Sequence, residues 1–270
     1  MYPNFIMSIV QMEVSEEKEK NLQKTKRFIK QAALSGASVV VLPEMFCCPY
    51  SSTSFPQYAE EQGGLIWQTL STAAKENHVL LIGGSMPERD GDKIYNTCFC
   101  FDENGNQIGR HRKVHLFDIE VKDGQKFKES DTIDAGNDCT VLDTKFGKIG
   151  VGICYDMRFP ELSRMMVNED ARLLVFPAAF NMTTGPLHWE LLLRSRAVDN
   201  QCYVIGASSA RNYYSDYISY AHSMVASPWG RIIVDGGERE CIISMPIIQT
   251  EIDEVRKQIP VLAHRRIDLY

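Results

Sequence analysis

The chain has 270 residues, of which 44% are hydrophobic and 24% are charged, and its formal net charge at pH 7 is -6. This composition is typical of a globular protein with a large core, and one domain spanning 1–270 is the simplest arrangement. Surfaces that bind nucleic acid or anionic membranes need clustered positive charge, so the acidic balance argues against both kinds of partner.

The eight cysteines lack regular spacing, which predicts free thiols in a reducing compartment and hence a cytoplasmic protein. Neither the Cys47–Cys48 pair nor Cys98 with Cys100 has the spacing of a metal site, so we expect no metal and no organic cofactor. No secretory signal is expected at the N-terminus, and no apolar run approaches the length of a membrane span.

The first half of the chain alternates predicted strands and helices. Residues 5–12 form a first strand, and a helix capped by Ser15 runs to about Leu34 and ends at Gly36. An apolar strand at 37–42, a helix at 65–77 and a buried strand at 78–85 follow. This order is typical of an α/β fold.

The second half is predicted to contain three hairpins. The first joins 94–101 to 107–113 around an Asn-Gly turn, and the polar segment 114–137 after it favours a functional loop. The second pairs 139–143 with 148–153 and is followed by a helix at 160–168 and a strand at 173–176. A helix at 188–200, a strand at 203–207 and a third hairpin, of 224–226 with 232–234, complete the prediction.

Cys154 stands where the apolar run 148–153 ends and just before Pro160 opens a helix. Such a strand-to-helix turn is a place for a nucleophile, because its backbone N–H groups can hold a developing oxyanion. Gly150 and Gly152 lack side chains and let a second backbone or a substrate approach. The alternative is a buried cysteine that packs as a small hydrophobe, and the local pattern does not decide between the two.

Two other polar residues also end predicted strands. Glu44 follows the run 39–42, where desolvation raises the pKa of a carboxyl towards that of a general base. Lys113 ends the strand 107–113 and can present a positive charge to an oxyanion. Because strand ends share one rim of an open sheet, Glu44, Lys113 and Cys154 can converge as base, oxyanion partner and nucleophile.

Each of these residues also has an ordinary interpretation. Glu44 and Lys113 can be solvated surface charges, and Glu129, in the polar loop, is expected to be one. Four histidines near strand or helix ends compete for the role of base, so a Cys/His hydrolase is an alternative. They are His111, His115, His188 and His222.

Three segments resemble, in the same order, the signature blocks of the nitrilase (carbon-nitrogen hydrolase) superfamily: 40–44 (VVLPE), 112–116 (RKVHL) and 152–161 (GICYDMRFPE). Segments 111–119, 127–130, 180–190 and 194–201 are similar to those of the omega-amidases within it. The resemblance implies a four-layer α-β-β-α sandwich and a homodimer formed by helices near Cys154 and Trp189. It also implies a triad of Glu44, Lys113 and Cys154, assisted by Glu129.

The implied reaction is hydrolysis of the terminal amide of 2-oxoglutaramate or 2-oxosuccinamate through a Cys154 thioester. The resemblance assigns the oxyanion to Lys113 and to the backbone N–H of Tyr155. A deaminated-glutathione amidase or an N-carbamoyl amide hydrolase of the same superfamily is one alternative. Another is a catalytically silent, oligomeric binding module, against which the intact Glu44, Lys113 and Cys154 count.

Four side chains are candidates for substrate binding. Tyr50, Phe117 and Phe180 are candidate walls of the pocket, although aromatic residues in such segments are as often core. Arg158 is a candidate partner for a substrate carboxylate, and an ion pair with Glu161 is the favoured alternative.

The chain departs from the superfamily pattern near the expected pocket. Ala178 stands where relatives usually carry glycine or serine, and Ala221 stands where they usually carry glycine. Cys47, Cys48 and Ser51 also replace commoner residues. These departures bear on substrate preference and leave the predicted chemistry intact.

Overall fold

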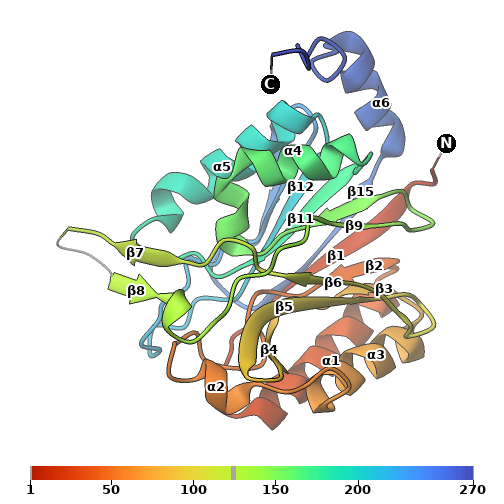
Figure 1. Ribbon diagram of the computed structural model, residues 1–270. Coiled ribbons are helices and arrows are strands. Elements are labelled where there is room, and N and C mark those ends of the chain that lie inside the picture. Colours follow the sequence, from red (N-terminus) through yellow and green to blue (C-terminus); the bar gives the residue numbers. More distant parts are fainter. Residues whose placement is uncertain (1, 123–125, 270) are drawn as a thin grey trace.

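Two β-sheets face each other in the computed structural model, which describes residues 2–122 and 126–269 (Figure 1). The first sheet has the strand order β15-β1-β2-β3-β5-β4, with β6 paired to β5, and the second has the order β14-β13-β12-β11-β10-β9. The strands of the first sheet are β1 (Phe5–Gln11), β2 (Val39–Val41), β3 (Leu80–Ile82), β4 (Met86–Asp90), β5 (Lys93–Phe101), β6 (Gln107–Arg112) and β15 (Cys241–Ile247). Those of the second are β9 (Thr140–Leu142), β10 (Ile149–Val151), β11 (Leu173–Ala178), β12 (Tyr203–Ser208), β13 (Met224–Ala226) and β14 (Ile232–Asp235).

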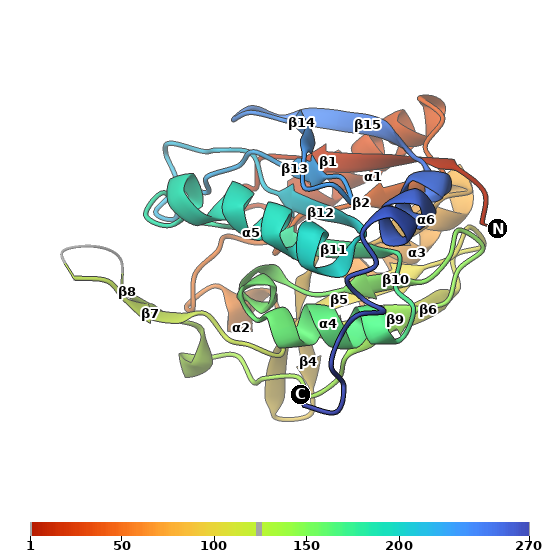
Figure 2. The same cartoon turned by 90° about the horizontal axis from the view of Figure 1, so that it is seen from above.

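Helices cover the outer face of each sheet (Figure 2). The first sheet is covered by α1 (Lys18–Leu34) and α3 (Leu65–Asn77), and the second by α4 (Pro160–Asn168) and α5 (Gly185–Asn200). Successive side chains of a strand point to opposite faces. Accordingly Val39 and Val41 pack in the cluster between the sheets, whereas Val40 packs with the α1 and α3 side chains. The fold is therefore the predicted four-layer α-β-β-α sandwich.

The two sheets share one pairing pattern. In the first, β1, β2 and β3 are parallel, and antiparallel strands flank them on both sides. In the second, β10, β11 and β12 are parallel and are flanked in the same way by β9 and β13. Glu44 follows β2 of the first sheet, and Cys154 follows β10 of the second.

Several predicted boundaries were wrong. Helix α1 begins at Lys18, and Ser15 does not cap it: its Oγ accepts the N–H of Glu17, before the first helical residue, and its own N–H and hydroxyl donate to Asn21 Oδ1. The predicted strand 78–85 is shorter, and β4 follows it. Helix α5 begins at Gly185, three residues before the predicted start, because Pro186 suits the first helical turn. The sequence did not predict β4, β15, α2 (Phe55–Tyr58) or α6 (Gln249–Gln258).

The segment 114–137 contains more structure than the predicted loop. A hairpin of β7 (Asp118–Glu120) and β8 (Lys126–Lys128) projects from the molecule (Figure 1), and a short 3-10 helix, η1 (Glu129–Asp131), follows. Positions 123–125 of the predicted loop lie outside the described residues. Glu129, directly after the hairpin, is fully buried, so the chain returns to the core at this point.

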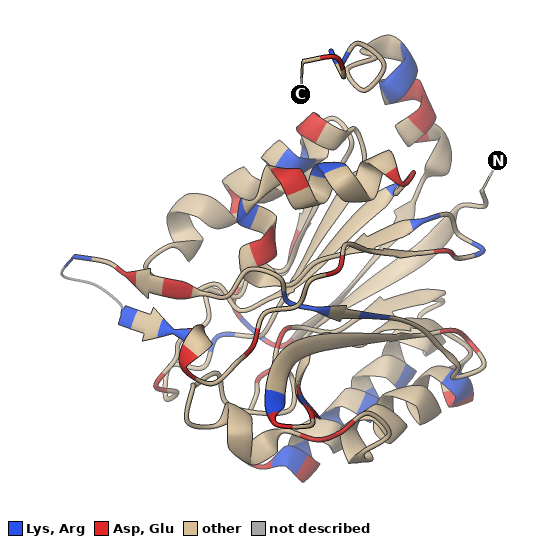
Figure 3. Cartoon of the chain, viewed as in Figure 1, with Lys and Arg blue, Asp and Glu red and all other residues tan. Residues whose placement is uncertain are grey.

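Charged residues gather mainly on the helices and on the β7–β8 hairpin (Figure 3). The strands between the helix layers carry few, apart from β4 with Glu88, Arg89 and Asp90 and β6 with Arg110 and Arg112. All eight cysteines are free. Within 2–122 and 126–269, no helix is long and apolar enough to cross a membrane, and no group of three or more His, Cys, Asp or Glu side chains is arranged to hold a metal ion.

Ala221 is buried with φ +64°, in the left-handed region that favours glycine. Relief of this conformation gains about 1–2 kcal/mol, whereas the larger conformational entropy of glycine in the unfolded chain costs about 0.4–1 kcal/mol and the lost buried methyl costs about 0.8 kcal/mol. We therefore expect Ala221→Gly to keep the free energy of unfolding within about 0.5 kcal/mol of the wild type. Urea unfolding measures this. The control Ala226→Gly, in strand β13, should lower it by about 1 kcal/mol. An equal loss of stability in both variants would exclude strain at Ala221.

Candidate functional site

Cys154 lies on a sharp turn between β10 and α4. The chain leaves β10 at Val151, Cys154 takes φ +45°, and a 3-10 helix, η2 (Cys154–Arg158), leads to Pro160 at the start of α4. The predicted strand-turn-helix is therefore confirmed, with η2 inserted in the turn. A non-glycine residue at positive φ is uncommon and persists where its surroundings hold it, often at a functional site.

The glycines before Cys154 serve core packing. A Cβ at Gly152 would lie 2.6 Å from the ring of Phe176, and one at Gly150 would lie 2.8 Å from Leu174 and from the sulfur of Met166. The room beside these glycines is thus filled by core side chains, so the expectation that they admit a substrate was wrong.

Three charged side chains meet in the core beside Cys154. Lys113 Nζ lies 2.9 Å from Glu44 Oε1 and 2.9 Å from Glu129 Oε2, and all three side chains are buried. Glu129 also accepts the Phe117 N–H at 2.7 Å. The expectation that Glu129 is a solvated charge was therefore wrong, because its carboxylate is hydrogen-bonded inside the protein.

The protonation of this cluster follows from its burial. Burial raises the pKa of Glu44, and the charge of Lys113 opposes that rise only in part. Burial pulls the pKa of Lys113 down, but the two carboxylates more than offset this, so the pKa is raised and the ammonium persists. Burial and the neighbouring Glu44 raise the pKa of the Cys154 thiol well above its usual range. The resting state therefore pairs a neutral thiol with a charged lysine.

The two oxygens of Glu44 have different surroundings. Oε1 accepts hydrogen bonds from Lys113 at 2.9 Å, Asn96 Nδ2 at 2.9 Å and the Tyr50 hydroxyl at 3.4 Å. Oε2 is buried without a hydrogen-bond partner in the described part of the chain. An anchored carboxylate with one unoccupied oxygen can accept a proton without moving, as general-base catalysis needs.

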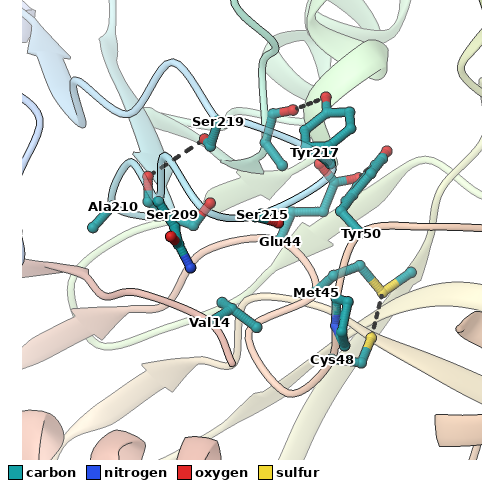
Figure 4. Close-up of a pocket in the computed structure, with 13 residues that line it drawn as sticks. Val14, Glu44, Met45, Cys48, Tyr50, Ser209, Ala210, Ser215, Tyr217 and Ser219 are labelled. Carbon is teal, nitrogen blue, oxygen red and sulfur yellow. Dashed lines mark hydrogen bonds between the residues drawn. The ribbon is translucent and has the colours of Figure 1, made fainter. Parts of the chain in front are cut away.

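Two clefts meet at Ala179. One contains Cys154, and its walls include Phe117, Arg158 and Phe180. The other is the pocket of Figure 4, where Glu44 and Tyr50 lie near Tyr217 and the serines of 209–219. This second pocket continues outward into a vestibule of about 410 Å³, with which it shares Tyr50 and Tyr217. One cleft thus reaches Cys154, and the other reaches Glu44 of the charged cluster.

The predicted substrate-binding side chains all line these clefts: Phe117, Arg158 and Phe180 beside Cys154, and Tyr50 beside Glu44. The guanidinium carbon of Arg158 lies 5.0 Å from the Phe180 ring centroid, and its Nη1 is 3.2 Å from His188 Nδ1. No ion pair joins Arg158 to Glu161 in the part of the chain that the structure describes, so the favoured pairing was wrong.

The sequence pattern of the carbon-nitrogen hydrolase family matches residues 7–257. This chain belongs to the carbon-nitrogen hydrolase family. It is 50% identical over 266 residues to omega-amidase NIT2-B of Xenopus laevis, covering 98% of this chain and 96% of that protein. To omega-amidase NIT2 of Homo sapiens it is 46% identical over 267 residues, covering 99% and 97%. The crystal structure of Saccharomyces cerevisiae Nit3, a member of branch 10 of the nitrilase superfamily, superposes with a TM-score of 0.91 at 43% identity, covering 98% and 97% of the two chains.

The histidines of this carbon-nitrogen hydrolase have other partners. His111 and His115 bond to Asp156, His188 contacts Arg158, and His222 contacts Asp235. Glu44 is the carboxylate that, after burial, raises the pKa of the Cys154 thiol. The geometry therefore favours a Cys/Glu pair over the Cys/His alternative.

Sequence reasoning missed two polar residues of the site. Asn96 Nδ2 lies 2.9 Å from Glu44 and 3.0 Å from Glu129, and so orients both carboxylates. The signal was an asparagine, followed by Thr97, inside the mainly apolar strand β5. Asp156 lies within the third signature segment, but its partners His111 and His115 are distant in sequence and only the fold brings them together.

Proposed function

We propose that this chain is an omega-amidase that hydrolyses the terminal amide of small dicarboxylic acid monoamides, such as 2-oxoglutaramate and 2-oxosuccinamate. The observation that carries the proposal is the buried group of Glu44, Lys113 and Glu129 beside the strained Cys154. Relatives named as omega-amidases, at 46–50% identity over nearly the whole chain, support the substrate class.

In the proposed first half-reaction, Glu44 takes the thiol proton as the Cys154 sulfur attacks the amide carbon. The oxyanion receives hydrogen bonds from the Lys113 ammonium and the Tyr155 backbone N–H. Glu44 then gives its proton to the leaving nitrogen of the tetrahedral intermediate. Ammonia departs, and a Cys154 thioester remains.

In the second half-reaction, Glu44 deprotonates a water molecule, which attacks the thioester carbon. The tetrahedral intermediate collapses, the carboxylic acid leaves, and the Cys154 sulfur recovers its proton from Glu44. Glu129 assists as a second carboxylate that, with Glu44, keeps the Lys113 ammonium charged and in place. This scheme requires no metal or organic cofactor.

Arg158 is the proposed partner of the substrate carboxylate. It is half-buried, lines the same cleft as Cys154, and has no carboxylate partner in the described part of the chain. A guanidinium recognises a carboxylate through paired N–H donors. Phe117 and Phe180 would then enclose the short chain between the carboxylate and the amide, and Tyr50 would support the Glu44 side.

A second candidate is an amidase with a larger leaving group, such as deaminated-glutathione amidase. The vestibule beyond Glu44 favours it, because a peptide-like amine needs space on the leaving-group side. An N-carbamoyl amide hydrolase is the remaining alternative in the family. The same assay separates all three.

The test compares ammonia or amine release from 2-oxoglutaramate, deaminated glutathione and an N-carbamoyl amino acid. The proposal expects the highest kcat/KM with 2-oxoglutaramate. For Arg158→Met, loss of a charged hydrogen-bond pair should raise KM for 2-oxoglutaramate by about 10- to 100-fold and leave a neutral amide of equal length unaffected. Equal losses on both substrates would exclude Arg158 as the carboxylate partner. Preference for another panel member would exclude omega-amidase as the main activity.

We also propose that two copies associate through α4 and α5. Leu187, Leu191 and Val198 are exposed along one side of α5, and Met165 is exposed on α4. Such a stripe is typical of an interface. Light scattering should give about twice the chain mass of 30.6 kDa. The proposal further treats 1–270 as one domain, supported by the family match, and places it in the reducing cytoplasm, supported by the eight free cysteines.

A further inference from the structure

Asp156 is a fully buried carboxylate two residues after Cys154, and both of its oxygens accept two hydrogen bonds. Oδ2 accepts from the Ile153 N–H at 2.9 Å and lies 2.9 Å from His111 Nε2. Oδ1 accepts from the His115 N–H at 2.9 Å and lies 2.8 Å from His115 Nδ1. The carboxylate is therefore satisfied without contact to either cleft.

The partners of Asp156 adjoin two reacting groups. His111 and His115 stand two residues before and two residues after Lys113, and Ile153 directly precedes Cys154. One carboxylate thus ties the end of β6, which belongs to the first sheet, to the turn that leaves the second sheet. Side chains hold Lys113 through its ammonium, whereas Asp156 holds the His111 side chain before it and the His115 backbone N–H after it.

We propose that Asp156 is a positioning residue that fixes the Lys113 ammonium relative to the Cys154 thiol. This inference rests on the proposed function, in which these two groups act on one carbonyl. Asp156 does not touch the substrate. Its effect is transmitted through His111, His115 and Ile153.

The turn at Cys154 requires such a restraint. A residue held at φ +45° relaxes unless its surroundings fix it, and the bond from Ile153 N–H anchors the chain immediately before the turn. The ring of His115 also stacks on Phe159, with ring centroids 3.6 Å apart and planes at 8°. Phe159 directly follows η2, so the Asp156 and His115 contacts hold both ends of the turn.

Asp156→Asn keeps the size of the side chain but turns one acceptor oxygen into a donor, which breaks bonds to Ile153 or to the His115 region. Because small misplacements of reacting groups are costly, kcat should fall by about 100-fold while KM stays within about threefold. Alkylation of Cys154 by iodoacetamide, followed by mass spectrometry, should slow by about tenfold, since the thiol loses its alignment with Lys113.

Asp235→Asn is the matched control, because Asp235 also pairs with a histidine and accepts a backbone N–H, from His222 and Gly237 respectively. It should keep wild-type kinetics. His115→Phe is the second variant: it retains the stack on Phe159 and the backbone bond but loses the Nδ1 bond. Since one of four bonds is lost, kcat should fall by about tenfold with unchanged KM and normal circular dichroism.

The inference is overturned if Asp156→Asn or His115→Phe, when folded, keeps kcat within twofold of the wild type. It is also overturned if the changes in kcat and KM only follow the loss of folded protein. If Asp156→Asn does not fold, His115→Phe decides. Failure of the proposed function is a separate result: Cys154→Ala would then still release ammonia. Loss of turnover in Cys154→Ala with normal kcat in Asp156→Asn would refute only the role of Asp156.

Discussion

Replacing Cys154 with alanine is expected to lower kcat for ammonia release by about 10⁴-fold or more, since removing a nucleophile removes the covalent pathway. No acyl-enzyme should appear by intact-mass spectrometry when substrate is added. Circular dichroism should match the wild type, because the substitution removes one buried sulfur from a turn that other contacts hold.

Cys202→Ala is the matched control. Cys202 is also free and fully buried, and burial raises the pKa of its thiol to about 12. It differs from Cys154 in having no carboxylate base among the groups that act on its thiol. Cys202→Ala should therefore retain full turnover. Wild-type ammonia release by Cys154→Ala would show that another group attacks the amide.

Lys113→Met should destabilise the fold and abolish most activity. Lys113 is the cation between two buried carboxylates, and breaking a buried ion pair by removing one partner costs about 3–5 kcal/mol. Loss of an oxyanion donor should lower kcat by a further factor of about 10²–10³. Lys145→Met removes the partially exposed pair with Glu103 and should cost no more than about 1 kcal/mol. Urea unfolding measures the loss in free energy of unfolding for both variants. Equal losses would contradict a stabilising role of the buried Lys113 network.

The cost of Lys113→Met should also depend on pH. In the folded protein the pKa of Glu44 already lies above its ordinary value of 4.5, so the folded state holds this proton at a pH where the unfolded chain has lost it. Between these two pKa values, stability falls as pH rises. Removing Lys113 raises the pKa of Glu44 further, so the deficit should be larger at about pH 7.5 than at about pH 5.5. A pH-independent deficit would assign the loss to packing.

The central strands were predictable because they are continuous apolar runs, which are typical of buried strands. Val39, Val40 and Val41 have no polar neighbour to obscure β2, and the Asn-Gly turn marks the β5–β6 hairpin. The strand β4 was missed because its sequence, Met86–Asp90, holds a proline and three charged residues. Its Glu88 is buried only because Arg110 and Arg112 of β6 neutralise it, a pairing that no local pattern shows.

The residues of the site were likewise only partly predictable from the sequence. Glu44, Lys113 and Cys154 were predictable because each ends a predicted strand, and the structure brings all three to one place. Asn96 and the Asp156 network depend on contacts across 33 to 52 residues of sequence, which periodicity does not encode. Glu129 looks solvated in its segment, and only the return of the chain after the β7–β8 hairpin buries it.

Strand β15 completes the first sheet by pairing along the whole of β1, from Phe5 with Ile247 to Gln11 with Cys241. During synthesis, β1 therefore waits for roughly 230 further residues before that edge is covered, on the order of 10 to 50 s at ordinary translation rates. An uncovered strand edge offers its backbone groups to other chains. The first strand to be synthesised is thus among the last to gain both of its neighbours. Until then its open edge can pair with other chains, so the nascent chain is prone to aggregate there.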